Sequence, residues 1–185
     1  MKKAIESLMS TKMKRTLFAL ALLMSNLLVS AQTMIIVDGL KYQVDGSSAS
    51  VVANRYTGKV VVPAQVSSGG TTYSVVAVAN DCFNGCDGLT AVELPASVKS
   101  LGKDGFGYCE NLPEVTIPAG VTKIGEDCFE FCSSLKKIVC KATTPPAVDG
   151  DLCDEPGEVT LVVPVAAVNA YKGADGWKEF KVVGE

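Results

Sequence analysis

The sequence predicts a mainly β protein, built as a short solenoid of stacked units with a cap at each end. Side chains of like type recur every 23 residues between Cys82 and Cys140. Within each repeat, apolar and polar residues alternate in short runs. The segments on either side keep the period only in part but contain enough apolar residues to cover the two ends. A fixed period in this range is typical of supersecondary units stacked one upon another.

Residues 1–31 are predicted to be a secretory signal peptide. A basic segment precedes the apolar run 17–31, which ends in Val29-Ser30-Ala31, and either Met1 or Met13 can serve as the start. The run is short for a bilayer span, and a retained anchor is the alternative. Export would place the chain in the periplasm, on the cell surface or outside the cell, with no integral membrane insertion after cleavage.

Charge and composition narrow the function classes. Removal of residues 1–31 leaves 12 Lys+Arg and 19 Asp+Glu, a net charge of −7, which argues against a nucleic-acid partner. The chain has no histidine, the commonest general base and metal ligand at neutral pH. The sequence therefore predicts no enzyme, no cofactor, and no catalytic or metal-binding residues.

The N-terminal cap is predicted over residues 32–58. Residues 34–37 and 40–44 flank the turn dipeptide Asp38-Gly39, and residues 49–53 form a third short strand. Such a meander would cover the open edge and apolar face of the first unit.

The 23-residue repeats are predicted over residues 59–142, the first with an insertion. Its strand, 59–62, lies 32 residues before the equivalent strand, and the additional residues fall in 67–72, a flexible loop by composition. In a later unit, alternation directs Val92 and Leu94 inward and Glu93 outward. The predicted repeat core is Phe83, Cys86, Leu89, Val92, Leu94, Phe106, Cys109, Leu112, Val115, Ile117, Phe129, Cys132, Leu135 and Ile138.

Residues that occupy the same place in successive repeats form a column, and two further columns mark turns. Gly102 and Gly125 are expected where the backbone needs a positive φ. Asp81, Asp104 and Asp127 are interpreted as N-caps of short helical turns. The alternative for this column is a ridge of carboxylates that attracts Ca²⁺, but nothing else supplies the oxygens that calcium needs.

Seven cysteines in an exported chain raise the question of disulfides. Cys86, Cys109 and Cys132 share one column, and we interpret them as buried thiols rather than bridges between units. Cys140 and Cys153 are the pair to test first for a bridge.

The last strand and the C-terminal cap are predicted over residues 143–185. Leu161 and Val163 lie 23 residues after Ile138 and Cys140. Residues 165–171 are predicted as a helical turn or two, and Trp177 and Phe180 would plug the open end.

The sequence pattern from Phe83 through Cys86, Leu89 and Val92 to Phe106 resembles the BspA-like leucine-rich repeat, also called the Treponema pallidum type. The resemblance covers about residues 60–163. It implies a right-handed β-rich solenoid on secreted or surface proteins of bacteria, often adhesins or binders of host matrix proteins. The family has no catalytic residues to transfer.

Tyr108 and Phe131 are the candidate ligand contacts, because they hold equivalent outward positions in consecutive units. Glu110 and Glu130 would border them. We expect an exported leucine-rich-repeat binding or adhesion module with a protein or glycan partner, host-derived ones included. The alternative is a structural, self-associating component of the cell envelope without a specific ligand.

Overall fold

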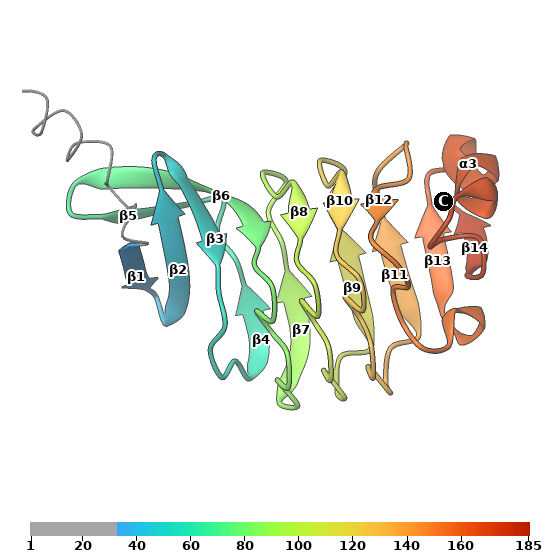
Figure 1. Ribbon diagram of the computed structural model, residues 1–185, viewed down its shortest axis with the longest axis horizontal. Coiled ribbons are helices and arrows are strands. Elements are labelled where there is room, and N and C mark those ends of the chain that lie inside the picture. Colours follow the sequence, from blue (N-terminus) through green and yellow to red (C-terminus); the bar gives the residue numbers. More distant parts are fainter. Residues whose placement is uncertain (1–32) are drawn as a thin grey trace, which may run out of the picture. The chain divides into compact units, whose positions relative to one another are not determined.

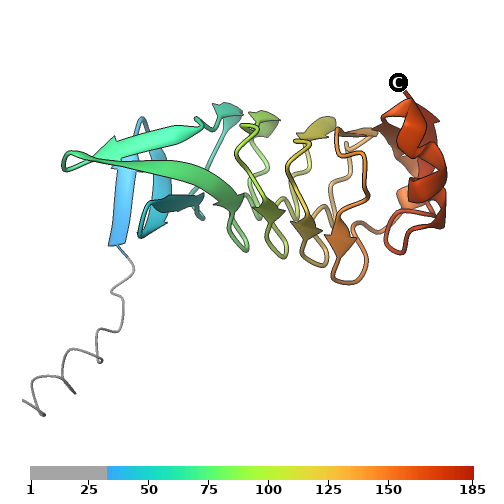
Figure 2. The same cartoon turned by 90° about the horizontal axis from the view of Figure 1, so that it is seen from above.

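The computed structural model describes residues 33–185, which form a β-solenoid with little helix (Figure 1). The predicted signal peptide lies outside the described residues. From above, the chain traces open coils that follow one another along the long axis (Figure 2). We call each coil a rung. The mainly β solenoid with two caps is confirmed.

The N-terminal cap is an antiparallel meander of β1 (Thr33–Val37), β2 (Leu40–Asp45) and β3 (Ser48–Val51). Asp38 and Gly39 make the β1–β2 turn with φ values of 49° and 79°. β3 then pairs in parallel with β6 (Thr71–Val78), so the meander continues into the first wall of the solenoid.

The first wall is a parallel ladder of β6, β8 (Ser100–Leu101), β10 (Lys123–Ile124) and β12 (Ala147–Val148). Leu101 pairs with Val78 and Ile124 with Leu101, which is the predicted period. The expected flexible loop is wrong: residues 67–72 are the tip of a hairpin between β5 (Gln65–Ser68) and β6. Gly69 and Gly70, with φ of 57° and 80°, form a two-residue turn that matches strand twist.

The second wall consists of two parallel sheets. β4 (Gly58–Val61) pairs with β7 (Leu89–Glu93), and Val60 faces Val92 at the predicted offset. β9 (Glu114–Ile117), β11 (Lys137–Cys140), β13 (Thr160–Val163) and β14 (Lys181–Gly184) form the other sheet. Pro113 precedes β9 and has no N–H for a bond to the β7 rung, whereas the next rung's Lys136 N–H donates to the Pro113 carbonyl.

The third side, which we call the turn face, comprises residues 81–86, 104–109 and 127–132. Its rungs are joined by backbone hydrogen bonds: the N–H groups of Asp81, Phe83 and Gly85 donate to the carbonyls of Lys103, Gly105 and Gly107. The N-cap interpretation of the Asp column is wrong, because Asp81, Asp104 and Asp127 have φ of 54°, 50° and 56°. An N-cap needs extended backbone. Aspartate suits these positions because it tolerates the left-handed region.

The core is centred on the phenylalanine column. Phe83, Phe106 and Phe129 are each 0% exposed. Their ring centroids are stacked 4.9 and 5.5 Å apart. The other predicted core residues are buried too, except Leu94 and Cys132, which are half-buried. Leu94 lies beyond the end of β7, while its counterparts Ile117 and Cys140 lie within strands.

Gly102 and Gly125 are not turn glycines, contrary to expectation, because neither has a φ in the left-handed region. Each instead lies against the backbone of the preceding rung. A Cβ on Gly102 would come within 2.5 Å of the Ala79 carbonyl carbon, and one on Gly125 within 2.6 Å of the Lys103 Cα. Glycine is required at these two positions because the backbones of neighbouring rungs come too close together for a Cβ.

The C-terminal cap closes the other end of the core. After β13 come two short helices, η2 (Val165–Ala167) and α3 (Val168–Gly173), and then β14, a parallel strand that the sequence did not predict. Trp177 and Phe180 are buried as expected. Tyr171 packs edge-on against Trp177, and the Trp177 Nε1 donates to the Pro146 carbonyl.

The close approach at Gly125 makes a testable prediction. Gly125→Ala should lower the free energy of unfolding by about 1–3 kcal/mol, because the new Cβ must displace backbone. Gly173→Ala is the control: its Cβ would meet nothing within 4 Å, so we expect a change within about 0.5 kcal/mol. Urea denaturation measures both, and equal stability of the two variants would contradict the packing argument.

Candidate binding surface

Two exposed aromatic side chains stand on the turn face in neighbouring rungs. Tyr108 and Phe131 are 45% and 47% exposed, and their ring centroids are 4.7 Å apart with a tilt of 35°. The phenylalanine two residues before each is fully buried. The structure therefore brings together the two predicted contact residues as a pair on the surface.

The backbone of both residues is strained. Tyr108 has a φ of 57° and Phe131 a φ of 53°, whereas the preceding rung has Gly85 in this position, with a φ of 66°. The left-handed region costs a residue with a side chain about 1–2 kcal/mol. Strain of this kind gathers at functional sites, where the surrounding structure holds it in place.

The amides of the pair are held differently. The Tyr108 N–H donates to the Glu130 carbonyl at 2.8 Å, as the ladder of the turn face requires. The Phe131 N–H donates instead to the Asp154 carboxylate, at 2.7 Å between N and Oδ2. The chain after residue 150 departs from the earlier register, so a side chain takes the place of a backbone carbonyl.

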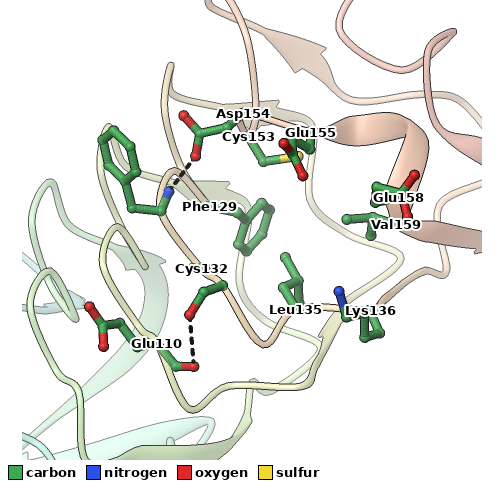
Figure 3. Close-up of a pocket in the computed structure, with 12 residues that line it drawn as sticks. Glu110, Phe129, Cys132, Leu135, Lys136, Cys153, Asp154, Glu155, Glu158 and Val159 are labelled. Atoms are coloured by element: carbon green, nitrogen blue, oxygen red, sulfur yellow. Dashed lines mark hydrogen bonds between the residues drawn. The ribbon is translucent and has the colours of Figure 1, made fainter.

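This departure opens a pocket of about 430 Å³ beside Phe131, which we call the C-terminal pocket (Figure 3). Phe129, Leu135 and Val159 line its apolar floor, next to the sulfur atoms of Cys132 and Cys153. Its charged lining residues are Glu110, Lys136, Asp154, Glu155 and Glu158. Cys132 is half-buried, unlike Cys86 and Cys109 in its column, because it faces this opening.

The structure places Glu110 and Glu130, the two acidic residues predicted to border the aromatic pair, in different surroundings. Glu110 lines the pocket. Glu130 belongs to a carboxylate cluster with Asp104 and Asp127, whose oxygens lie within 4.8 Å of one another. Desolvation, together with the Asp127, Asp154 and Asp104 carboxylates, raises the pKa of Glu130.

This cluster is where a cation could be held. Calcium takes six to eight oxygens, and the cluster offers three side-chain carboxylates. Asp81, which belongs to the same repeated set of aspartates as Asp104 and Asp127, is not part of the cluster. The Lys103 ammonium already lies 3.9 Å from the Asp127 carboxylate and pairs with Glu126.

The seven cysteines are free thiols. Cys140 and Cys153, the pair to test first for a bridge, are not joined: the Tyr171 hydroxyl donates to the Cys140 sulfur in the core, while Cys153 lines the pocket. The thiols of Cys109 and Cys132 donate to the carbonyls of Phe83 and Phe106, one rung earlier. The repeated cysteine column is thus a column of small core residues with a weak donor.

Sequence reasoning missed the pocket-lining segment 153–159. It follows the Pro145-Pro146 pair, where the repeat pattern is lost, and contains the short helix η1 (Pro156–Glu158). The available signal was charge: Asp154, Glu155 and Glu158 fall within five residues.

The parallel walls, the turn face and the phenylalanine column define a leucine-rich-repeat solenoid. Residues 66–145 match the family described as BspA type leucine rich repeat region (6 copies). Residues 66–145 therefore carry BspA-type leucine-rich repeats.

Solved structures share the fold. A leucine-rich repeat protein from Bacteroides capillosus is 24% identical over 70% of this chain and 97% of that chain, with a TM-score of 0.57. One from Bacteroides ovatus is 23% identical over 82% and 41%, with a TM-score of 0.60. The T. pallidum leucine-rich repeat protein is 20% identical over 84% and 80%, with a TM-score of 0.55. No curated protein matches the sequence significantly. Among residues 33–185, no helix has the length and apolarity to span a bilayer.

Burial of the thiols predicts sensitivity to alkali. Burial raises the pKa of Cys82 and Cys128 above the ordinary value of 9.0, and that of Cys153 to about 12. Below pH 9 the thiols are neutral in both states, and their contribution to stability is complete. Above it the unfolded chain ionises first, so stability should fall by about 1.4 kcal/mol per pH unit for each such thiol.

Urea denaturation under reducing conditions between pH 7 and 10.5 measures this slope. Cys82→Ala/Cys128→Ala should lower stability overall but flatten the alkaline decline. A slope that is identical in the two proteins would contradict the assignment to these thiols.

Proposed function

We propose that this chain is an exported, non-catalytic binding module, and that Tyr108 and Phe131 form its contact surface for a protein or glycan partner. The observation that carries the proposal is the strained, exposed aromatic pair. Glycine fills the equivalent place one rung earlier without strain, so folding alone does not call for two large aromatics here.

The physical basis of binding is preorganisation. The two rings are spaced by the rungs beneath them and lie 4.7 Å apart before any partner arrives. Aromatic side chains offer large contact area with few torsions to order, and a rigid array loses little entropy on binding. Leucine-rich repeats are widely used for protein interaction, which favours a protein over a glycan.

Export of the chain from the cytoplasm is part of this proposal. Residues 1–31 have the pattern of a signal peptide, and export would bring the surface to the periplasm, the cell exterior or the medium. An adhesive role, with a host-derived partner, is the form of this function that the family resemblance favours.

The test removes the rings and leaves the fold. Tyr108→Gly/Phe131→Gly installs the residue already present at position 85, so the free energy of unfolding should stay equal or rise by up to about 1 kcal/mol. Binding to partners found with the unaltered chain on a protein and glycan array should be lost. Val61→Ser is the control, since Val61 is 53% exposed on β4, away from the pair. Undiminished binding by the glycine variant would refute the assignment.

A second candidate function is self-association, and the observation that favours it is β1. This strand ends the eight-stranded sheet, and Met34 and Ile36 on it are 48% and 71% exposed (Figure 1). An apolar strand at a sheet edge is a template for pairing with another chain. A second copy could thereby extend the first wall.

Light scattering coupled to size-exclusion chromatography separates the two functions. Self-association through β1 predicts a mass that rises with concentration, and a monomer for Ile36→Lys, because a charge at the edge opposes strand pairing. Thr90→Lys, on exposed β7 surface, is the control for added charge. A constant monomer mass of the unaltered chain would eliminate this function.

A further inference from the structure

Charge on the two walls is neutralised across rungs. Lys123 pairs with Asp149 at 2.8 Å, and Lys59, Lys103 and Lys137 pair with Glu93, Glu126 and Glu114. The C-terminal pocket departs from this pattern. Within residues 33–185, no ion pair or side-chain hydrogen bond involves the carboxylates of Glu110, Glu155 and Glu158 or the ammonium of Lys136. With Asp154, the rim carries four carboxylates against one lysine.

The floor of the pocket has the opposite character. Phe129, Leu135 and Val159 lie behind the pocket and are only 0%, 4% and 5% exposed, so its accessible apolar surface comes from the Phe131 ring and the half-buried Cys132 and Cys153. Figure 3 shows the carboxylates of Glu110, Asp154, Glu155 and Glu158 standing around Phe129 and Leu135. An apolar floor inside an acidic rim is complementary to a side chain with an aliphatic stem and a cationic end.

Two features select arginine over lysine. The rim presents carboxylates from two segments, Glu110 on one and residues 154–158 on the other, and a planar guanidinium can bond several acceptors at once. The Phe131 ring also borders the pocket, and guanidinium groups stack on aromatic faces.

We propose that the C-terminal pocket receives an arginine side chain of a partner protein, with its stem against Cys132 and Cys153 and its guanidinium among Glu110, Asp154, Glu155 and Glu158. This inference rests on the proposed binding function and specifies its partner as a protein with an exposed arginine. Tyr108 and Phe131 would contact the partner next to that residue.

The Phe131 amide is a built-in reporter, because it donates to the Asp154 carboxylate. The probe is the peptide acetyl-Gly-Arg-Gly-amide, titrated into ¹⁵N-labelled protein and followed by two-dimensional NMR. We expect saturable shifts of the Phe131 and Asp154 amides. The citrulline counterpart has the same shape without the charge and should bind at least about tenfold more weakly. The lysine counterpart should fall between them.

Glu155→Gln/Glu158→Gln keeps side-chain size and should weaken the arginine peptide about tenfold. Asp38→Asn/Asp45→Ser removes the same charge from the N-terminal cap and should leave binding unchanged. Equal binding of the citrulline peptide, or equal loss in both variants, would overturn the inference. Saturation of the same amides by Ca²⁺ with displacement of the peptide would also overturn it, in favour of a cation site.

The outcomes of these experiments distinguish a failure of the arginine pocket from a failure of the binding function proposed for Tyr108 and Phe131. If a partner needs Tyr108 and Phe131 but is unaffected by Glu155→Gln/Glu158→Gln, the arginine pocket fails and the binding module stands. If the arginine peptide binds but array binding survives Tyr108→Gly/Phe131→Gly, the pocket stands and the contact surface proposed above fails.

Discussion

The stacking of Phe83, Phe106 and Phe129 is the contact on which the other features depend. Their centroid separations of 4.9 and 5.5 Å are close to the roughly 4.8 Å between hydrogen-bonded strands. One column of rings can therefore lie inside while backbone ladders form on both walls and on the turn face. The same spacing requires a bare Cα at Gly102 and Gly125, where one rung lies directly against the next.

The candidate surface inherits its geometry from this column. Tyr108 and Phe131 lie two residues beyond stacked phenylalanines, so their own rings are held one rung apart. The energy that holds them in left-handed backbone comes from the packed rungs beneath and from the amide ladder. Where that ladder loses its register, Asp154 replaces a carbonyl and the acidic pocket opens beside the pair.

Several features were predictable from the sequence and others were not, for physical reasons. The core columns and the exposed aromatic pair followed from side-chain type and spacing. The Asp81 column was misassigned because aspartate is favoured both at N-caps and in left-handed backbone, and only φ separates the two. Gly102 and Gly125 were misassigned for a similar reason, since the presence of a glycine in the sequence does not show whether its φ or a close neighbour requires it. β14 and the pocket lie where the period ends, and there the spacing carries no information.

The sequence by itself determined that like residues stack, and hence which side chains are inside, because a strict period can bury its apolar columns only by laying coil on coil. It also determined the acidic balance of the chain and the absence of histidine. Tertiary structure alone decided which residues are strained, where backbones touch, and that Glu110 meets residues 154–158 around an apolar floor. Those features depend on distances between segments far apart in the chain, and such distances exist only once the rungs have packed.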